Sequence, residues 1–300
     1  MRGRSGRHLM CSDCRVLVVV IVTFSAEATM LDACVASVRA AGHVDHIIVV
    51  DNGGGAVVDA GVELIRPPRN LGFGGGANVG FRRAAELGAS EVALLNDDVE
   101  VDAGWLEPLV AALATDDTLG AVQPKLLMAG AEPPRVNSVG VGIDAAGAGG
   151  DIGFGELDGP AFAQDRAIES FTGGAVLFRS RFLDATHGFD ESYFLYYEDA
   201  DLAKRGAELG WTYRCVPASI VRHRVSASAA QLGDRTRYLQ ERNRLRFVFR
   251  YGDAGMIRRA LWLSLRRVRW RPRWAHVRAL ATGVALAPGA LVARRAAHRR

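Results

Sequence analysis

Cysteine is scarce in this 300-residue chain, which contains only four cysteines. Four are too few for a disulfide-stabilised scaffold, and this favours a chain that folds around an apolar core in a reducing compartment. Cys11 and Cys14 form a C-x-x-C pair, but a second pair at zinc-binding spacing is missing. We therefore interpret the pair as ordinary thiols, with a metal or redox role as the minor alternative.

Long apolar runs are also lacking. The run 16–24 follows a basic N-terminus, as in a signal peptide, but it has no small-residue cleavage site and leads into a helix-like segment. We expect a buried first strand there. The last apolar stretch, 279–293, contains Pro288 and Gly289 and is shorter than the roughly 20 residues of a membrane-spanning helix. The sequence therefore predicts no transmembrane helix.

Charge is unevenly distributed along the chain. From Arg235 onward there are 18 arginines, no lysine and two acidic residues, whereas the preceding part carries a net charge of −12. An acidic body followed by a basic tail predicts that the tail meets an anionic partner.

Strand-like and helix-like segments alternate in the first half of the chain. The apolar, β-branched runs lie at 16–23, 47–50, 62–65, 92–95 and 121–122. The helix-like segments lie at 28–41, 77–87 and 105–114. This alternation predicts an α/β fold with a mostly parallel sheet and helices on both faces.

The second half is less regular. Residues 129–165 are rich in glycine, alanine and aspartate without periodicity, which predicts a long loop or a hairpin. Further strands are expected at 175–178, 213–216 and 219–221, and a helix at 199–209. We divide the chain into a disordered extension (1–15), an α/β domain (16–232) and an Arg-rich helical region (233–300).

Polar side chains gather where the expected strands end. Thr23, Asp51-Asn52 and Asn96-Asp97-Asp98 each follow an apolar strand. In open parallel sheets ligands bind at the carboxyl ends of the strands. Adjacent carboxylates repel each other unless a cation or strong donors offset the repulsion, and Mg²⁺ or Mn²⁺ would do so with oxygen ligands. For Asp97-Asp98 a helix N-cap is an equally weighted alternative.

Two further motifs indicate a functional site only when they are considered together with this edge of the sheet. The acidic segment 198–201 opens a helix, where capping and the helix dipole are the more usual explanation and a general base for a hydroxyl is the other. His223 follows a strand between Arg222 and Arg224 and would be a sensible further ligand of a metal held by Asp98.

The glycine-rich segment 69–78 opens a helix, a geometry suited to phosphate or ribose. Gly72, Gly74 and Ala77 fit the pattern G-x-G-x-x-A, but Pro67-Pro68 separate the segment from the preceding strand. The first strand–helix turn, 23–26, contains no glycine, so a dinucleotide-dependent oxidoreductase is disfavoured.

Taken together, these segments resemble family 2 glycosyltransferases of the GT-A fold, especially the bacterial rhamnosyltransferase-like branch. The resemblance runs from about residue 16 to 228 and, more loosely, to 251. Each motif is weak alone, and their common order makes the resemblance specific. The motifs are Val22-Thr23-Phe24, Val49-Val50-Asp51-Asn52, Asn70-Leu71-Gly72-Phe73 with Asn78-Val79-Gly80, Leu95-Asn96-Asp97-Asp98-Val99, Thr172-Gly173-Gly174-Ala175, Gly188-Phe189-Asp190-Glu191 with Tyr197 to Leu202, and His223.

The resemblance implies a role for each matching residue. The nucleobase and ribose would be held by Thr23, Phe24, Asp51 and Asn52, and the nucleotide pocket lined by Asn70, Gly72 and Asn78. Asp98 and His223 would bind the metal, Mg²⁺ or Mn²⁺, with Asp97 at the ribose or the metal shell. Gly173 and Gly174 would leave room for sugar and acceptor. Asp199 would be the catalytic base, with Glu198 beside it.

The activity implied is inverting, metal-dependent transfer of one sugar from a nucleotide-diphosphate sugar (dTDP-rhamnose or a UDP-sugar) to an acceptor hydroxyl. The acceptor would be a cell-envelope glycan or a lipid-linked glycan. Processive members carry Q-x-x-R-W, whereas the nearest match here, 240–244, lacks the tryptophan. Addition of a single sugar is therefore expected. The alternative is a non-catalytic sugar-nucleotide-binding protein of the same fold.

The basic tail contains an amphipathic segment, Met256–Val268, and three of the five tryptophans, Trp262, Trp270 and Trp274. Arginine and tryptophan together suit the interface of an anionic membrane. We favour this interpretation over a helical appendage packed on the α/β domain. Nucleic acid is disfavoured because no nucleic-acid-binding fold accompanies the charge. The predicted location is cytoplasmic, peripheral to the inner face of the membrane.

Overall fold

A computed structural model describes residues 15–24, 28–42, 44–224 and 233–297 of the chain. The Cys11–Cys14 pair and all but the last residue of the predicted N-terminal extension lie outside the described residues.

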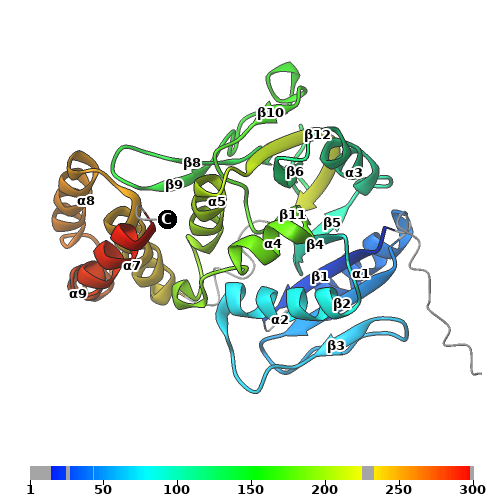
Figure 1. The fold of residues 1–300 in the computed structure, drawn as a ribbon, viewed down its shortest axis with the longest axis horizontal. Helices are drawn as coiled ribbons and strands as arrows, with labels where there is room; N and C mark the ends of the chain where they lie inside the picture. Colours follow the sequence, from blue (N-terminus) through cyan, green and yellow to red (C-terminus); the bar gives the residue numbers. More distant parts are fainter. Residues whose placement is uncertain (1–14, 25–27, 43, 225–232, 298–300) are drawn as a thin grey trace, which may run out of the picture.

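The described part of the chain forms one large sheet, helices on both of its faces and three helices at one end (Figure 1). The strands are β1 (Leu17–Thr23), β2 (His46–Asp51), β3 (Glu63–Ile65), β4 (Glu91–Asn96), β5 (Val99–Val101), β6 (Leu119–Met128), β7 (Val136–Ser138), β8 (Val141–Ile143), β9 (Gly149–Asp151), β10 (Arg166–Ala167), β11 (Ala175–Arg179) and β12 (Thr212–His223). The α-helices are α1 (Ala28–Ala40), α2 (Gly72–Glu86), α3 (Leu106–Thr115), α4 (Ser180–Thr186), α5 (Glu198–Glu208), α7 (Asp234–Tyr251), α8 (Ala254–Arg267) and α9 (Arg273–Ala297).

The strand order in the main sheet is β10-β12-β6-β11-β4-β1-β2-β3. Strands β4, β1, β2 and β3 are parallel neighbours, as are β6 and β12, and β11 runs antiparallel between β4 and β6. The carboxyl ends of β1, β2, β4 and β12 therefore meet at one edge. The predicted α/β architecture is confirmed.

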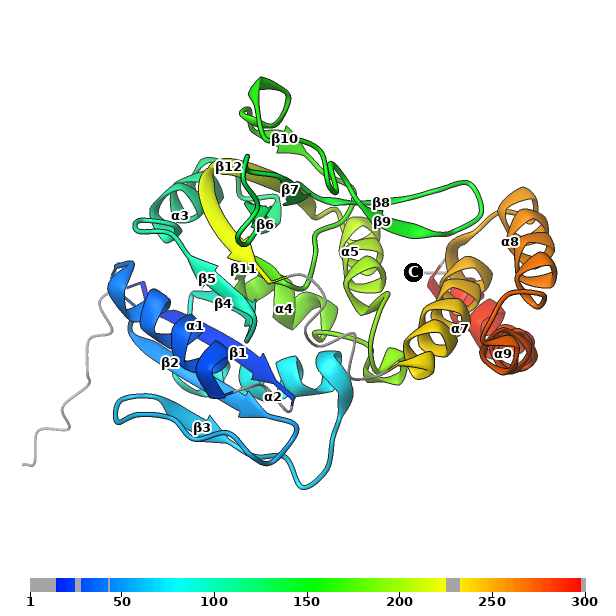
Figure 2. The same ribbon diagram turned by 180° about the vertical axis from the view of Figure 1, so that it is seen from behind.

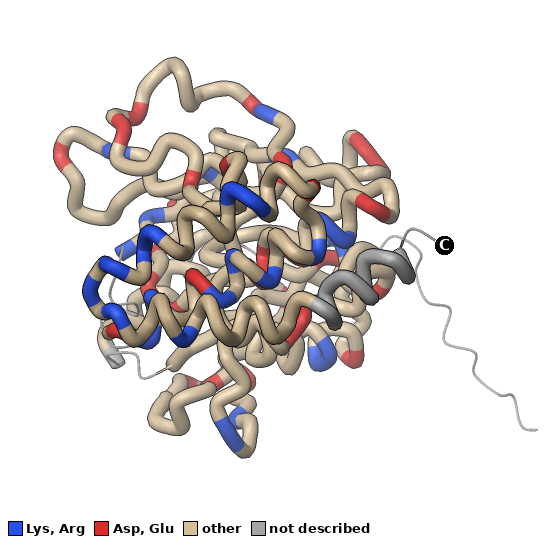
Figure 3. The backbone as a smooth tube through the Cα atoms, turned by 90° about the vertical axis from the view of Figure 1, so that its left-hand side faces the viewer, with Lys and Arg blue, Asp and Glu red and all other residues tan. Residues whose placement is uncertain are grey.

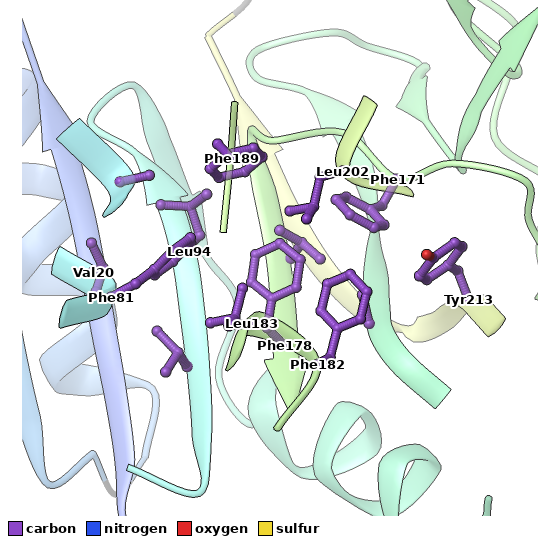
Figure 4. Packing of buried hydrophobic residues seen from close by; sticks show 14 of the residues in the cluster. Val20, Phe81, Leu94, Phe171, Phe178, Phe182, Leu183, Phe189, Leu202 and Tyr213 are labelled. Carbon is purple, nitrogen blue, oxygen red and sulfur yellow. The ribbon is translucent and has the colours of Figure 1, made fainter. Parts of the chain in front are cut away.

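The two faces of the sheet bury separate cores because successive side chains of a strand point to opposite faces. From β1, Leu17, Val19 and Ile21 pack against α1 and α3, whereas Val18 and Val20 pack against α2 and α4. The second core is rich in aromatic rings (Figure 4). Because both faces are buried, the strand sequences are continuous apolar runs and do not alternate between apolar and polar residues.

Helices α7, α8 and α9 lie together at one end of the sheet, and the β8–β9 hairpin extends toward them (Figure 2). They share a small apolar core that includes Leu245, Val248 and Ala260. Arginines are concentrated on these helices, which face the viewer in Figure 3. None of the described helices is long and apolar enough to cross a bilayer, and the division at residue 232/233 stays a prediction.

Two elements differ from expectation. Helix α2 begins at Gly72, not at residue 77, and its glycines pack closely: a Cβ on Gly80 would lie 2.2 Å from Val20 Cγ1. The two short strands expected at 213–221 are one strand, β12, which stays continuous through a register shift between Val216 and Ile220. The hairpin alternative for residues 129–165 is confirmed, because this segment contains the β8–β9 hairpin together with β7.

We expect Phe178→Ala to lower the free energy of unfolding by about 3–5 kcal/mol, because the fully buried ring packs edge-on against Phe171 and stacks on Phe182. Phe154→Ala is the matched control, since its ring is 54% exposed and should cost less than about 1 kcal/mol. Urea unfolding measures both. Equal losses in the two variants would contradict this account of the core.

Candidate active site

The polar residues predicted at the strand ends do share one edge. Thr23 ends β1, Asp51 ends β2, Asn96 ends β4 and His223 ends β12. Asp97 and Asp98 form the turn that joins β4 to β5. A strand, not a helix, follows this turn, so the N-cap alternative for these two carboxylates is wrong.

Asp98 and His223 are neighbours because β5 pairs with β12. Val99 lies opposite His223 in the antiparallel register, and the Arg224 N–H donates to the Asp98 carbonyl over 2.9 Å. This places His223 Nε2 3.1 Å from Asp98 Oδ1. The register between two strands, far apart in the sequence, thus creates the pair.

The pair has the donor chemistry of a cation site. Asp98 Oδ1 is buried and receives no hydrogen bond of acceptable geometry from the described residues, although His223 Nε2 is close. His223 Nδ1 lies 2.8 Å from Asn137 Oδ1, which as an acceptor holds the proton on Nδ1 and leaves a lone pair on Nε2. Two electron-rich atoms 3.1 Å apart fit a divalent cation. In the described part of the chain, no group of three or more such side chains forms a metal site, so substrate oxygens would have to complete the coordination.

Asp97 is held by the end of the first strand. The Thr23 hydroxyl and the Phe24 N–H donate to its carboxylate. Burial nevertheless raises the pKa of Asp97 to about 6, with a contribution from the charge of Asp98. This repulsion is the cost that the sequence pattern predicts for adjacent carboxylates. Phe24 is 39% exposed, so its ring is accessible beside this turn.

Asp51 stabilises the loop that follows β2. Asp51 accepts hydrogen bonds from the N–H groups of Gly53, Gly54 and Ala56 and from Arg66. Burial alone would raise its pKa, but these donors outweigh burial and lower it. Its predicted contact with a nucleobase stays a prediction.

Asn52 and Asn70 shape the start of α2. The Asn52 amide donates to the Gly72 carbonyl and accepts from the Leu71 N–H, and Asn70 accepts from the Gly72 N–H. Gly72 has a φ of +75°, and a Cβ there would lie 2.1 Å from the Phe194 carbonyl oxygen. The glycines of this segment therefore allow close backbone packing. They do not form the open phosphate loop that the sequence suggests.

Asn78 has a structural role in the described part of the chain. Its amide donates to the Phe189 carbonyl and to Glu191, and it accepts from the Phe189 N–H. Both ends of the amide are therefore engaged, and they hold segment 189–191 in place. Its predicted contact with the nucleotide stays a prediction.

A cavity of about 590 Å³ lies between this sheet edge and the helices α7–α9. Gly173, Gly174, Glu198 and Asp199 line it, together with Asn96. Asp199 Oδ2 lies 3.3 Å from the Gly173 N–H, and its Oδ1 accepts from the Ala200 N–H. A Cβ on Gly173 would lie 2.8 Å from the Phe73 ring, so this position has no space for a side chain.

The two adjacent carboxyls in the cavity differ in their protonation. Burial, with a smaller contribution from the charge of Asp151, raises the pKa of Asp199 to about 6. Burial and the neighbouring Asp199 charge raise the pKa of Glu198 well above its usual value, and Glu198 Oε2 has no hydrogen-bond partner among the described residues. Asp199 is therefore the more acidic of the two carboxyls, and Glu198 holds a proton more readily than Asp199.

Residues 18–129 match the family model described as Glycosyl transferase family 2. This part of the chain is therefore similar to the family 2 glycosyl transferases. A curated relative, N-acetylglucosaminyl-diphospho-decaprenol L-rhamnosyltransferase of Mycobacterium tuberculosis, is 28% identical over 215 residues in each of two strains. The match covers 63% of this chain and 66% of the relative.

Solved glycosyltransferases share the fold. GalNAc-T7 with UDP, GalNAc and Mn²⁺ matches with a TM-score of 0.63 at 15% identity, over 90% of this chain and 54% of that chain. The mannosyltransferase PcManGT from Pyrobaculum calidifontis, in complex with GDP-Man and Mn²⁺, matches with a TM-score of 0.56 at 18% identity, over 95% and 81% of the two chains. The α/β domain of this chain thus has the GT-A fold.

One carboxylate of the cavity was missed by the sequence patterns. Asp151, at the end of β9, lines the cavity and is hydrogen-bonded by Ser138. Burial raises its pKa, and the hydrogen bond from Ser138 opposes the rise. The charge of Asp151 also raises the pKa of Asp199, so the two carboxyls lie within electrostatic reach of each other. A lone acid after Gly149-Gly150 gives no periodic signal that would have identified it.

The backbone before Asp199 is strained. Phe194, Tyr196 and Tyr197 have φ values of 68°, 70° and 72°, which non-glycine residues rarely adopt. Asn243 of α7 stabilises this segment, because its buried side-chain amide donates to the carbonyls of residues 193, 195 and 196. Helix α7 therefore holds the segment that positions Asp199.

We expect the Asp199 carboxyl to titrate at about pH 6 in chelator-treated protein. Since burial raises its pKa, it should lose its charge as the pH falls through 6, about two units above an ordinary aspartate. Infrared difference spectra of the carboxyl band measure this. Asp199→Asn should remove this transition, and Asp97→Asn should remove a separate one near the same pH. A wild-type transition confined to pH 4 would contradict the burial argument.

Proposed function

We propose that this protein is an inverting, metal-dependent glycosyltransferase that moves one sugar from a nucleotide-diphosphate sugar to an acceptor hydroxyl. The observation that carries the proposal is the convergence of two groups of residues in a GT-A fold whose residues 18–129 match the family 2 model. Asp98 and His223 meet at the sheet edge, Asp199 faces the adjoining cavity, and Asp151 lines the same cavity and raises the pKa of Asp199.

The donor nucleotide is proposed to bind along the carboxyl edge, beside Thr23, Phe24 and Asp97. Asp98 and His223 would hold the divalent cation, Mg²⁺ or Mn²⁺. When bound, the cation would neutralise charge on the departing diphosphate. The Asn137 contact orients the His223 ring for this task, because it fixes the ring nitrogen that carries the proton.

Asp199 is proposed as the general base. It is ionised at neutral pH, and its raised pKa makes it a better proton acceptor than an ordinary aspartate. The acceptor hydroxyl would give its proton to Asp199 and attack the anomeric carbon in one displacement, which inverts that carbon. Glu198 lies in the same wall, and its raised pKa favours the protonated form, which would donate a hydrogen bond to sugar or acceptor.

The curated relative suggests the substrates. That protein is named for the transfer of L-rhamnose to N-acetylglucosaminyl-diphospho-decaprenol. By this likeness we propose dTDP-rhamnose as donor and a lipid-linked glycan as acceptor, with a UDP-sugar as the alternative donor. The missing Q-x-x-R-W signature supports addition of a single sugar.

The C-terminal helices are proposed to contact an anionic membrane surface at the inner face of the cell membrane. Trp262, Leu265, Trp270 and Trp274 are exposed apolar residues on α8, α9 and the turn between them. The Arg266 guanidinium lies 4.5 Å from the centre of the Trp262 ring. Exposed tryptophan with flanking arginine suits the interface between lipid headgroups and acyl chains.

Two aspartate variants should separate metal binding from proton transfer. Asp98→Ala should weaken Mn²⁺-dependent donor binding at least about tenfold, because a metal ligand is lost. Asp199→Asn should keep donor binding but lower kcat by about 10²- to 10⁴-fold, because the base is lost. Calorimetry and turnover of dTDP-rhamnose and UDP-sugars measure these effects. Donor binding without hydrolysis or transfer in the wild type would favour the non-catalytic alternative, and equal loss of binding in both variants would remove Asp199 from the base role.

Replacement of Trp262 and Trp274 by serine should reduce co-sedimentation with phosphatidylglycerol vesicles at least about fivefold, because both indole rings leave the interface. The matched control is Phe154→Ser with Leu157→Ser, two exposed apolar residues of the α/β body. Equal binding by both double variants and the wild type would contradict the membrane contact.

A further inference from the structure

The cavity that contains Asp199 has two chemically different walls. Asp151, Glu198 and Asp199 form an acidic wall on the side of the α/β body. The opposite side is built by α7, α8, α9 and the turn between the last two. We call its basic members, Arg237, Arg267, Arg271 and His276, the basic wall.

The positive charge of this side is not balanced by the described protein. Of its lining residues, four are arginines and one, Glu241, is a carboxylate. Glu241 is already engaged by Arg244 at 2.6 Å and by Arg267 at 2.7 Å. Burial alone would raise its pKa, but the hydrogen bonds and charge of Arg244, Ser264 and Arg267 lower it to about 2. Among the described residues, Arg237 and Arg271 form no ion pair.

Two buried polar atoms of the basic wall also lack partners. His276 is only 5% exposed, lines the cavity, and its Nδ1 has no hydrogen-bond partner in the described part of the chain. Arg267 Nε is likewise buried without an acceptor. Buried polar atoms are normally satisfied. Arg267 Nε is a donor, and His276 Nδ1 is one when the ring carries its proton there, so both atoms fit a ligand that brings acceptor oxygens. A guanidinium fork matches the oxygens of a phosphate group in particular.

We propose that the basic wall binds a phosphate or diphosphate group carried by the acceptor, and that this contact presents the acceptor hydroxyl to Asp199. The inference rests on the proposed function and specifies the acceptor class by its charge. The proposed donor residues Thr23, Asp97, Asp98 and His223 do not line this cavity, which reaches the donor edge only at Asn96 and Gly173-Gly174. An acceptor and a donor would therefore approach the same base from different sides.

The outer end of the cavity supports an acceptor that arrives from a surface. Trp270 lines the cavity and is 57% exposed, and the neighbouring Arg271 is also exposed. The phosphate chemistry could come from the acceptor or from a membrane phospholipid. We assign it to the acceptor, because His276 and Arg267 Nε are buried inside the cavity, where a headgroup of an intact bilayer would not reach.

The test measures binding of inorganic pyrophosphate to the full chain by calorimetry, with chelator present so that the proposed metal pair stays unloaded. Arg237→Gln with Arg271→Gln should weaken pyrophosphate binding at least about tenfold, since two charge-assisted contacts are lost. Arg258→Gln with Arg269→Gln is the matched control: it removes the same charge from exposed arginines that do not line the cavity. Equal weakening in both double variants would show that only the net charge of the protein matters, and this would overturn the proposal.

A second measurement needs no variant. Pyrophosphate should slow amide hydrogen exchange in residues 267–276 of the wild-type chain, and unchanged exchange there would overturn the proposal. Two further experiments distinguish the possible sources of the phosphate group. We call the Arg237→Gln, Arg271→Gln double variant the cavity pair. Sedimentation with phosphatidylglycerol vesicles should be equal for the cavity pair and the control double variant, and a loss of sedimentation in the cavity pair alone would assign the basic wall to lipid headgroups and overturn the proposal.

Mn²⁺-dependent binding of UDP and of dTDP should be unchanged by the cavity pair. A loss there would assign the wall to the donor and overturn the proposal. Failure of the proposed function is a distinct result: no nucleotide sugar would be bound or turned over by the wild type, whether or not pyrophosphate binds the basic wall.

Discussion

Buried carboxylates at the edge of the sheet are the constraint on which the rest of this structure depends. Removing a carboxylate from water is costly unless donors, a cation or a proton compensate. The protein uses a different means at each position. Backbone N–H groups and Arg66 compensate Asp51, Arg205 and Arg250 compensate Asp201, and a raised pKa favours the protonated form of Glu198. Asp98 Oδ1 has no hydrogen-bond partner among the described residues, and the pKa of Asp199 stays raised to about 6 although two backbone N–H groups donate to it. To these two residues the proposed chemistry assigns a cation and a proton.

The C-terminal helices complete this arrangement. Arg250 of α7 reaches Asp201 of α5 at 2.9 Å, and Asn243 holds the strained backbone before Asp199. Tyr197 donates to the Gly147 carbonyl and Arg244 to the Ala146 carbonyl, so the tip of the β8–β9 hairpin is tied to both α5 and α7. Segments 141–151, 194–199 and 237–276 thereby enclose one cavity. The arginine-rich region serves the site directly, whatever else its exposed tryptophans contact.

Much of the donor edge could be predicted from the sequence because short segments of sequence determine it. An apolar β-branched run that ends in Thr23, Asp51 or Asn96 predicts a strand and a polar residue at its carboxyl end, and parallel strands bring such ends together. The glycine segment was less predictable. A glycine that opens a phosphate loop and one that lets α2 approach Val20 look alike in sequence, since only the tertiary neighbours of the missing Cβ distinguish them. Asn78 is similarly ambiguous in sequence, because an amide that binds a ligand and one that holds a neighbouring segment differ only in their tertiary contacts.

By itself, the sequence determined the alternation of strands and helices, the acidic character of the sheet edge, the scarcity of cysteine and the concentration of arginine after residue 234. These are properties of short segments, encoded in side-chain periodicity and composition. Tertiary structure alone decided that Val99 pairs with His223 and so brings it to Asp98, that Asp151 joins the cavity, and that Asn243 stabilises residues 193–196. These contacts connect residues separated by about 50 to 125 positions in the printed sequence, and they depend on strand register and helix packing, which no local pattern specifies.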